Sequence, residues 1–592
     1  MSISPPPRKR PRSESTLESE DGPLAVGRYT LESIRTYLTS LRAIPVDLET
    51  FSDPSKCASL LFPSLLKSSI HFLAAPSGEY TLHHMGRSIF STIWSQVEQL
   101  DRQIPSSIAL VGTYGSGKSH LLSALASFLF AQGKRVVFLP ECPLVAEDPI
   151  FWLKLAFALP FADLSDTIQR ILQFKTIDEF VEFTRGSRED IYFLVDGLDQ
   201  LQPDFKAYIS TLTSSQLFIY STYALDTHSP TMRRALPIRI PSGLSPSELT
   251  HWLHHFQSQL PTDMNGIYRA FIETYTGSIP SLLLRLFDFC GQVFCEALTK
   301  YRASREFHTL ADNIVEFHTA VEKLDPVQKS RYHSLMRACF TETIPEIRFG
   351  ANAALYDPRY FYFDSDGKGH CVCGLVRDIL TPLLRMDDLD MFTTDAWYSA
   401  VRSGSPRIRD FSIAQICLSR IGMGGLTQAD TQGNAMRICA FRQNPNFVWM
   451  FEEAWKNPRG MSSFLCMPGH EVCPMLNAVI MRINPSDRTA QLIPLQITSA
   501  QTCIDVAGLF FTVTWHRWET AILQEGFKVV NTFVAIDNLT PECAEIAAKS
   551  AKLRQSAQLL SPNYSVRNLN AGQIDPKLGR ILQGDKLSSP PL

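Results

Sequence analysis

A short glycine-rich segment carries the residue types and spacing that most clearly indicate chemistry. Residues 112–119 read Gly-Thr-Tyr-Gly-Ser-Gly-Lys-Ser, which meets every fixed position of the pattern Gly-x-x-x-x-Gly-Lys-[Ser/Thr]. Gly112 and Gly117 allow backbone angles that a Cβ would forbid, so the N–H groups of the loop can point at a bound phosphate. Lys118 would reach the β- and γ-phosphates, and the hydroxyl of Ser119 would ligate Mg²⁺. The segment therefore predicts a nucleotide site.

Two elements must hold this loop in place. The apolar run Ile108–Val111 predicts a short buried strand before it, and Ser119–Ala131 predicts a helix after it. The helix carries apolar residues on one face, so we expect it to pack on a sheet with the positive end of its dipole at the phosphates. Gly133 closes the helix. The predicted nucleotide-binding residues are Gly112, Thr113, Tyr114, Gly115, Ser116, Gly117, Lys118, Ser119 and His120.

A second strand end supplies a carboxylate. Ile191–Val195 is an apolar run followed by Asp196, which would hold the water shell of the magnesium ion at the same sheet edge as Ser119. An aspartate at a strand end also forms turns, and this alternative stays open. The next strand, Leu217–Thr222, ends in hydroxyl groups that either sense the γ-phosphate or cap the strand. The candidate catalytic residues are Lys118, Asp196 and Asp199.

Strands and helices alternate through this region. Arg135–Leu139 and Leu236–Ile240 predict two further strands, and apolar residues at helical spacing precede the Asp196 strand. Ser245 and Glu248 form a capping-box pattern that opens another helix. Such alternation predicts an α/β fold in which helices cover a parallel sheet. No Asn-Lys-x-Asp guanine-reading motif occurs, so we expect ATP rather than GTP.

Composition sets the class of protein. The chain has 592 residues, 45% of them apolar, and 56 basic against 59 acidic residues give a formal net charge of −3. This length predicts roughly three to four domains, and the balanced charge leaves any nucleic-acid surface to local patches. The 13 cysteines show no disulfide framework, which favours a reducing compartment. We find neither an apolar run of the roughly 18 residues that span a membrane nor an apolar leader, so we expect no membrane partner and no signal peptide.

Shifts in composition predict six segments. The first is rich in Pro, Ser, Glu and Arg, and its cluster Pro5–Arg12 matches a nuclear import signal, with a solvated basic tail as the alternative. We therefore expect the protein in the nucleus. The segments are a disordered tail with this basic cluster (1–25), a helical lead-in (26–104), a phosphate-loop NTPase (105–300), a helical and hairpin middle region (301–405), a C-terminal α/β domain (406–560) and a loose polar tail (561–592).

Several features together resemble the AAA+/STAND branch of phosphate-loop NTPases. They are the loop at 112–119, a strand inserted before the Asp196 strand, and Thr276–Leu282, which is similar to a segment that STAND proteins place after the sheet. Many ATPases of this branch carry Glu directly after the strand-end Asp. Here that position is Gly197, and Asp199 is the nearest substitute. The resemblance implies an ATP-binding switch and supports nucleotide binding more firmly than hydrolysis. Arg233, Arg234 and Arg285 are candidate contacts to the γ-phosphate, with a surface role as the alternative.

The middle region predicts a hairpin over Tyr360–Cys373, in which aromatic residues flank an Asp/Gly turn. His370, Cys371 and Cys373 lie close enough in sequence to suggest a metal, but no second ligand pair stands at zinc-finger spacing. A small hairpin with buried thiols is therefore favoured. The pair Asp364 and Asp366 lacks the full calcium-loop pattern.

The C-terminal region predicts a helix, several strands, a helix and a strand. This order resembles the restriction-endonuclease-like (PD-(D/E)xK) fold, which holds Mg²⁺ with an Asp on one strand and an acid-x-Lys motif on the next. The best alignment places Asn477, Pro494 and Gln496 at those positions, so the metal site is incomplete. Glu452, Glu453 and Glu471 are nearby acids, for which an ordinary surface role is favoured. The predicted elements are helices at 411–421 and 504–515 and strands at 437–441, 477–483, 490–498 and 529–536.

The combination resembles the Crinkler/retrotransposon-hot-spot (RHS-like) proteins. Besides the NTPase features, Asp357–Phe361 and the strand end Leu495–Thr498 carry this resemblance. It implies an NTPase coupled to a nuclease-like domain, nuclear action and, in some members, delivery to the nucleus of a host cell.

These patterns leave three hypotheses for function. The leading one is an ATP- and Mg²⁺-binding switch, in which hydrolysis or exchange repositions a degenerate nuclease-like C-terminal domain that has DNA as its expected partner. The second makes the C-terminal domain an active Mg²⁺-dependent nuclease that ATP regulates. The third is a scaffold with a vestigial nucleotide site. The sequence predicts a nucleotide partner in the first two cases and leaves the oligomeric state open.

Overall fold

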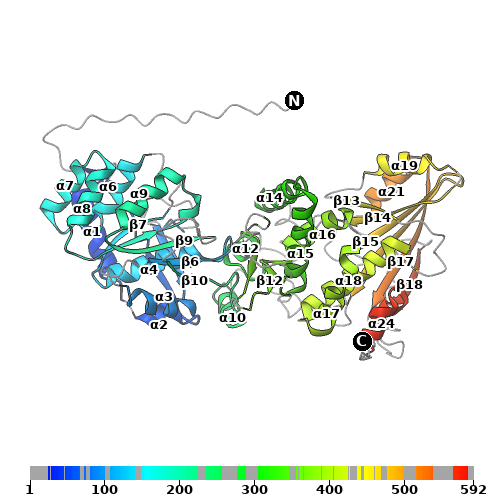
Figure 1. Ribbon diagram of the computed structural model, residues 1–592, viewed down its shortest axis with the longest axis horizontal. Coiled ribbons are helices and arrows are strands. Elements are labelled where there is room, and N and C mark those ends of the chain that lie inside the picture. The colour runs from blue at the N-terminus through cyan, green and yellow to red at the C-terminus, as the bar shows by residue number, and fades with distance from the viewer. Residues whose placement is uncertain are drawn as a thin grey trace. The chain divides into compact units, whose positions relative to one another are not determined.

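The computed structural model describes most of residues 25–583, and Figure 1 draws it as a ribbon. The predicted tail 1–25 lies almost wholly outside the described residues. Among the described helices, none combines the length and the apolar character needed to cross a membrane. The gaps are 27–28, 46, 67–72, 75–79, 101–106, 141–147, 224–234, 257–271, 273–275, 288–304, 346–354, 356, 358, 365, 388–389, 405, 425, 427–435, 442–445, 459, 469–476, 499–514 and 538–563.

The chain forms two compact units. The first contains residues 1–111 and 118–238, and the second contains residues 112–117 and 239–592. The division separates the glycine-rich loop at 112–117 from the strand and the helix that flank it in sequence.

A five-stranded sheet forms the centre of the first unit. Its strand order is β10-β6-β9-β8-β7, and the pairs β6/β9, β9/β8 and β8/β7 are parallel. Helices lie on both sides of this sheet (Figure 1), which confirms the predicted helix-covered parallel sheet. The strands are β6 (Ser107–Val111), β7 (Arg135–Leu139), β8 (Ile191–Val195), β9 (Leu217–Thr222) and β10 (Ala235–Arg239). The helices include α1 (Leu31–Arg42), α4 (Lys118–Ala131), α6 (Pro149–Ala158), α7 (Ser165–Gln173), α8 (Ile177–Gly186) and α9 (Pro203–Thr213).

Helix α4 is buried on nearly every side. Leu122, Leu125 and Leu129 have no exposed surface, as expected for the face that meets the sheet. Its serines are buried as well, because Ser123 and Ser127 donate hydrogen bonds of 2.9 and 3.2 Å to carbonyls one turn earlier in the helix. The burial of both faces fixes the position of the first turn of α4.

The predicted helical lead-in 26–104 is wrong in its middle part. A three-stranded antiparallel sheet in the order β3-β5-β4 lies there, between the short helix α2 and helix α3. The rings of Phe51, Phe90 and Phe128 meet at centroid distances of 5.1 to 5.7 Å, so this segment covers the outer face of α4. The elements are β1 (Ala25–Val26), β2 (Tyr29–Thr30), α2 (Leu48–Ser52), β3 (Cys57–Leu61), β4 (Leu73–Ala74), β5 (Tyr80–Met85) and α3 (Ile89–Val97).

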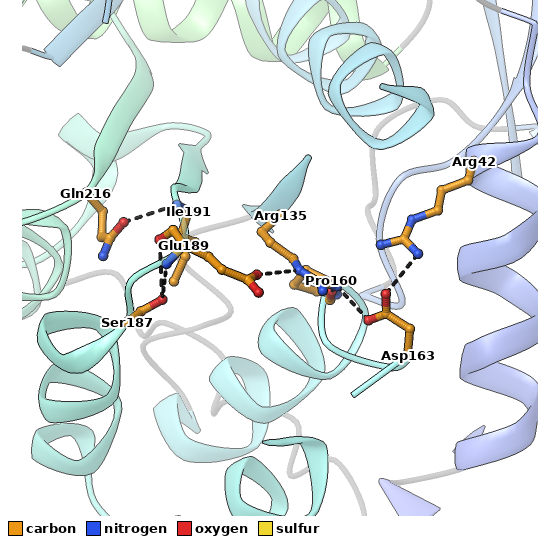
Figure 2. A network of polar contacts seen from close by, with 8 residues as sticks. All are labelled: Arg42, Arg135, Pro160, Asp163, Ser187, Glu189, Ile191 and Gln216. Carbon is orange, nitrogen blue, oxygen red and sulfur yellow. Dashed lines mark hydrogen bonds and ion pairs between the residues drawn. The ribbon is translucent and has the colours of Figure 1, made fainter. Parts of the chain in front are cut away.

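Arg135, at the start of β7, joins separate elements of the first unit through polar contacts (Figure 2). Its guanidinium forms ion pairs with Asp163 at 2.6 Å and with Glu189 at 2.8 Å, and it donates to the carbonyl of Pro160. Asp163 also pairs with Arg42 of α1 at 3.0 Å. The side chain of Arg135 is only 13% exposed, so solvent screens these pairs less than it would at an open surface.

The second unit begins with helices and one hairpin. The capping box of Ser245 and Glu248 and the predicted hairpin are both confirmed, the latter as antiparallel β11 and β12. The helices are α10 (Pro246–His255), α12 (Pro280–Phe287), α14 (Arg305–Glu322), α15 (Pro326–Thr341), α16 (Gly374–Asp387), α17 (Asp395–Ser403) and α18 (Pro406–Gly424), and the hairpin strands are β11 (Phe361–Phe363) and β12 (Gly369–Cys371).

A six-stranded mixed sheet follows in the order β13-β14-β15-β16-β17-β18. Strands β14, β15 and β16 are antiparallel neighbours, whereas β16/β17, β17/β18 and β13/β14 are parallel. Helices α19 and α21 pack on one face of the sheet, where Phe451 and Trp518 join Phe464, Met481 and Leu492 in one buried cluster. The elements are β13 (Arg437–Phe441), α19 (Phe447–Trp455), β14 (Ser462–Pro468), β15 (Ala478–Asn484), β16 (Thr489–Thr498), α21 (Trp515–Gln524), β17 (Lys528–Asp537) and β18 (Tyr564–Asn570). Most of the predicted helix 504–515 lies outside the described residues.

The predicted loose tail 561–592 is wrong for residues 564–583. Strand β18 completes the sheet, and α23 (Ala571–Ile574) and α24 (Pro576–Leu582) follow it. Asp575 is 1% exposed and accepts hydrogen bonds from Tyr398 at 2.8 Å and Arg420 at 2.7 Å, while it caps α24 through the N–H of Leu578 at 2.7 Å. Burial alone would raise the pKa of Asp575, but these hydrogen bonds lower it below the usual 3.8.

We expect Asp575→Ala to destabilise the second unit by about 2–4 kcal/mol, because it removes a helix cap and leaves the partners of a buried carboxylate without their acceptor. Urea unfolding followed by circular dichroism measures this loss. Asp395→Ala is the matched control, since Asp395 pairs with Lys577 while its side chain is 94% exposed. Equal midpoints for the two variants would show that the C-terminal helices are not held in this way.

Candidate functional site

The glycine-rich loop connects β6 to α4, as predicted, and its backbone depends on two glycines. Gly115 and Gly117 have φ values of +73° and +92°, in the left-handed region that disfavours other residues. The prediction that Gly112 needs such angles is wrong. Gly112 is needed for space, because a Cβ there would stand 3.0 Å from Ser116 Oγ and 3.1 Å from the carbonyl oxygen of Ile240.

Residues of the second unit hold this loop from outside. The N–H of Tyr114 donates to the carbonyl of Arg359 at 3.3 Å, and the N–H of Ser281 donates to the carbonyl of Gly115 at 3.4 Å. A Cβ on Gly115 would stand 1.9 Å from Ser281 Oγ. Within the loop, Ser116 donates its hydroxyl to the carbonyl of Thr113 at 2.9 Å. The first turn of α12 and the segment at Arg359 therefore fix the loop backbone.

In the first unit, Lys118, Ser119 and Asp196 come together at the ends of α4 and β8. The hydroxyl of Ser119 hydrogen-bonds the carboxylate of Asp196, and the ammonium of Lys118 interacts with the same carboxylate. Lys118 and Asp196 are 8% and 7% exposed. The two residues that the sequence assigns to the magnesium ion are thus neighbours, and their oxygen atoms are ligands of the kind that Mg²⁺ prefers.

Burial shifts both charges in this cluster toward their neutral forms. It lowers the pKa of Lys118 to about 8, although Asp196 and Asp199 oppose the shift. It also raises the pKa of Asp196 above 3.8, against hydrogen bonds from Ser221 and Ser119 and the charge of Lys118. The charged forms of Lys118 and Asp196 therefore lose hydration free energy on burial, and the surrounding protein groups do not fully offset this loss.

The sequence did not predict which residues orient the side chains of Asp196 and Lys118. Ser221 at the end of β9 donates its hydroxyl to Asp196 at 2.5 Å and accepts the N–H of Gly197 at 2.8 Å. These two contacts are of the capping kind, and the predicted alternative of sensing the γ-phosphate stays a prediction. Tyr223 lies under the ammonium of Lys118, with 4.3 Å from Nζ to the ring centroid. No sequence spacing links these positions, because sheet pairing brings them together.

Asp199 reaches the same strand end. One carboxylate oxygen accepts the N–H of Tyr223 at 3.0 Å, and the other is buried with no hydrogen-bond partner among the described residues. A buried carboxylate oxygen without a donor is costly unless a ligand or water satisfies it. The charge of Asp199 thus acts on Lys118, and one buried oxygen of Asp199 has no hydrogen-bond partner among the described residues.

The side chain of His120, predicted to bind the nucleotide, packs against His84. Its ring stacks on His84 at 5.2 Å, and Nε2 of His120 stands 3.1 Å from Nδ1 of His84. The other nitrogen of His84 contacts the carbonyl of Phe51 at 3.2 Å, so the pair joins α4 to the lead-in segment. The position of His120 indicates a packing role.

In the hairpin, the side chains that were suggested as metal ligands contact other protein groups. No group of three or more His, Cys, Asp or Glu side chains suited to a metal ion occurs among the described residues. His370 contacts Asp364 at 2.9 Å and Glu342 at 3.7 Å, while the thiol of Cys371 donates to the carbonyl of Cys339 at 3.7 Å. The favoured prediction is a small hairpin with buried thiols: the hairpin is present and Cys373 is buried, but Cys371 is only partly buried.

In the C-terminal sheet, the two aligned residues with amide side chains, Asn477 and Gln496, lie close together. The side-chain oxygen of Asn477 accepts the N–H of Ile497 at 2.6 Å, next to Gln496 on β16, and Gln496 is 5% exposed. Glu452 is exposed on α19, as expected of a surface carboxylate, whereas the side chain of Glu453 is only 12% exposed and pairs with Arg437 and Lys456. Arg233, Arg234, Glu471 and the side chain of Arg285 lie outside the described residues.

Comparisons with known proteins add little to this geometry. No protein-family model matches the sequence. No curated protein matches it either. Among solved structures, the chain is similar to a Signal Transduction ATPase with Numerous Domains (STAND) protein with a tetratricopeptide repeat sensor from Pyrococcus horikoshii, at 12% sequence identity and a TM-score of 0.23. The match covers 61% of this chain and 49% of that one, so the chain spans about half the length of this neighbour. The α/β class of the first unit rests on its own sheet and loop.

We expect Gly115→Ala to lower stability by about 2–4 kcal/mol, because it forces a Cβ into a left-handed backbone and against Ser281. Gly367→Ala is the matched control, since Gly367 has a φ of +81° with no atom within 4 Å of an added Cβ. It should lose only about 1 kcal/mol. Urea unfolding midpoints compare the two, and a smaller loss for Gly115→Ala would mean that the loop is not packed against α12.

The His370 ion pairs predict a pH dependence of stability. Burial by itself lowers the pKa of His370, but hydrogen bonds and charges from Glu342 and Asp364 outweigh it and raise the pKa above 6.5. The raised folded-state pKa means that the stabilisation is complete below pH 6.5 and is lost as pH rises through the folded value. The melting temperature of wild type should therefore exceed that of His370→Gln most at pH 6 and least above pH 8. The exposed His83 supplies the control variant His83→Gln, which should keep the wild-type profile.

Proposed function

We propose that this protein is an ATP-binding, Mg²⁺-dependent switch of the phosphate-loop NTPase class. The observation that carries the proposal is the cluster of Lys118, Ser119 and Asp196 at one sheet edge, directly after a loop whose glycines adopt left-handed angles. An ammonium, a hydroxyl and a carboxylate in this order are the groups that phosphate-loop proteins use for the β- and γ-phosphates and for Mg²⁺. The composition of the loop alone would not bring Asp196 to the site.

The residues present fit the ligands that the proposal requires. Bound phosphates would supply negative charge to Lys118, whose pKa burial lowers to about 8. A magnesium ion would supply positive charge beside Asp196, whose pKa burial raises, and beside the buried oxygen of Asp199 that has no hydrogen-bond partner among the described residues. When bound, Mg²⁺ neutralises charge on the phosphates. Both ligands thus relieve a cost of burial that the protein groups leave in place.

The position that orients the attacking water in many related ATPases differs in this chain. Gly197 occupies the position where many related ATPases carry a glutamate, and its φ of +69° shows that this glycine serves the turn after β8. Asp199, three positions later in the chain, is the acid nearest to that role. The protein therefore binds ATP and alternates between nucleotide states, with slow turnover or exchange ending each state.

We further propose that the C-terminal domain is a degenerate nuclease-like domain that binds DNA. The run α19, β14, β15, β16, α21, β17, with an antiparallel meander followed by a parallel strand, supports this proposal. The sequence alignment assigns Asn477 and Gln496 to the positions of metal-binding and catalytic residues in such a fold, and an amide cannot neutralise a magnesium ion. Membership of the Crinkler/RHS-like group and nuclear localisation through Pro5–Arg12 belong to the same proposal.

Lys118→Ala should weaken binding of ATP and of ADP at least about 10- to 100-fold, because each loses a charge-assisted hydrogen bond to the β-phosphate. Isothermal titration with MgATP and MgADP measures both affinities. Lys134→Ala, which removes an exposed lysine just after the same helix, is the control and should bind as wild type does. A wild-type protein without affinity for either nucleotide, or a Lys118→Ala variant that binds equally well, would refute the switch.

The same preparation separates the candidate roles of the C-terminal domain. ATP turnover is measured with and without double-stranded DNA in Mg²⁺ buffer, and the DNA is then examined for cleavage. Stimulated turnover with intact DNA supports a switch coupled to a DNA-binding domain. Cleaved DNA would instead support the active nuclease, and a protein that neither binds nucleotide nor responds to DNA would support the scaffold.

A further inference from the structure

Two arginines of helix α16, within the second unit, are buried against helix α18. Arg377 and Arg385 stand about two helical turns apart in one stripe of α16. Arg385 hydrogen-bonds to side chains of α18, and Arg377 lies over the ring of Phe411 in the same helix, with 4.6 Å from Cζ to the ring centroid. We call this contact between α16 and α18, which contains both arginines, the arginine seam.

Arg385 shows how the protein satisfies one of these side chains. Its guanidinium donates to the hydroxyl of Ser419 and to the side-chain oxygen of Gln415, the latter at 2.5 Å. The ring of Phe392 covers its face, with 4.3 Å from Cζ to the ring centroid. Burial lowers the pKa of Arg385 to about 9, and no acidic group among the described residues offsets this shift. Neutral acceptors therefore hold this charge.

Arg377 is buried almost as deeply but lacks such acceptors. The residue is 4% exposed, and its guanidinium makes no hydrogen bond or ion pair with any residue that the structure describes. The ring of Phe411 contacts the face of the guanidinium, whereas its N–H donors lie along the edge. A buried donor without an acceptor has lost its hydration and gained no bond in return. The seam therefore contains a positive charge that no described group compensates.

Ser412 adds a second unpaired donor, on the opposite helix. It has no exposed surface, and its hydroxyl oxygen is buried with no hydrogen-bond partner in the described part of the chain. Ser412 precedes Gln415 and Ser419 by one and two helical turns, and both of these contact Arg385. The helical repeat therefore places Ser412 on the face of α18 that is turned toward α16.

We propose that the arginine seam binds a free phosphate-type dianion, through the guanidinium of Arg377 and the hydroxyl of Ser412. A tetrahedral oxyanion presents paired acceptor oxygens that match the guanidinium fork, and it leaves a further oxygen for the hydroxyl. Neither buried arginine forms an ion pair with a described residue, which favours a double negative charge over a single one. Arg377 keeps 4% of its surface and Arg385 keeps none, so the narrow access favours a free ion over the phosphate of a larger molecule.

The two helices of the seam connect different parts of the second unit. Helix α16 follows hairpin strand β12, and α18 contacts strand β16 of the six-stranded sheet. An ion bound between α16 and α18 would therefore fix the hairpin region to the C-terminal sheet. All residues of the seam belong to the second unit, so this inference does not depend on the proposed nucleotide site.

Isothermal titration and thermal unfolding of the full chain with inorganic phosphate test the inference. Every sample carries Lys118→Ala, so that the glycine-rich loop does not contribute, and sodium chloride at equal ionic strength is the reference. Phosphate and sulfate should raise the melting temperature, and chloride should not. Arg377→Met should weaken phosphate binding at least about 10-fold, and Ser412→Ala about 3- to 10-fold. Arg409→Ala, at an exposed position of α18, is the control and should bind within about 2-fold of its parent.

Stability in the absence of the anion separates a binding role of Arg377 from a purely structural one. In buffer without phosphate or sulfate, Arg377→Met should melt at or above the temperature of its parent, because it removes an unpaired buried charge and keeps an apolar stem. Arg385→Met is the matched comparison and should melt lower, because it leaves the buried acceptors of Ser419 and Gln415 without their donor.

Two results would overturn the anion site. One is a phosphate affinity that Arg377→Met leaves unchanged, and the other is a melting temperature that phosphate and chloride raise equally. A loss of stability in Arg377→Met as large as that in Arg385→Met would also contradict it, since the side chain would then be structural. Arg377→Lys keeps the charge without the fork and covers the case in which the methionine variant does not fold. It should bind phosphate with an affinity between those of the parent and Arg377→Met.

Discussion

The burial of Lys118 beside Asp196 is the constraint on which the candidate site depends. An ammonium and a carboxylate that are 8% and 7% exposed have lost most of their hydration, and burial acts on both pKa values in the direction of neutrality. A protein that needed only stability would replace such a pair with apolar side chains of similar size. Under the proposed function, the phosphates of a nucleotide bring negative charge to Lys118 and a magnesium ion brings positive charge to Asp196. The cost in the free protein is then recovered in the bound state.

Keeping Lys118 beside Asp196 requires that helix α4, which begins at Lys118, is packed in a fixed position. Helix α4 has the sheet on one side and the rings of Phe51 and Phe90 on the other, and its serines satisfy their hydroxyls inside the helix. Ser221 adds a second restraint, because its single hydroxyl serves both the Asp196 carboxylate and the N–H of Gly197. The site is thus assembled from a packed helix and two strand ends, and positional precision comes from the core.

Local patterns predicted most of the first unit, and long-range contacts account for what they missed. The strands 135–139, 191–195 and 217–222 follow directly from apolar runs, and Lys118, Ser119 and Asp196 follow from motif positions. The lead-in strand 57–61 was hidden because its side chains vary between exposed and buried without a clean alternation. Asp575 resembles a residue of a polar tail in sequence, and only partners 155 and 177 positions away identify it as buried.

The aligned positions of the C-terminal sheet carry neutral amides, in contrast to the charged pair of the first unit. Asn477 extends the pairing of β15 with β16, because its N–H donates to Leu495 at 3.0 Å and its side-chain oxygen accepts the N–H of Ile497 at 2.6 Å. A carboxylate could accept the same bond, but it would add a partly buried negative charge next to Gln496, which is itself only 5% exposed. Amides at both places remove the need for a cation. The candidate site of the first unit therefore keeps buried charged side chains, whereas the aligned positions of the second unit carry neutral amides, and the proposed switch depends on the charged set.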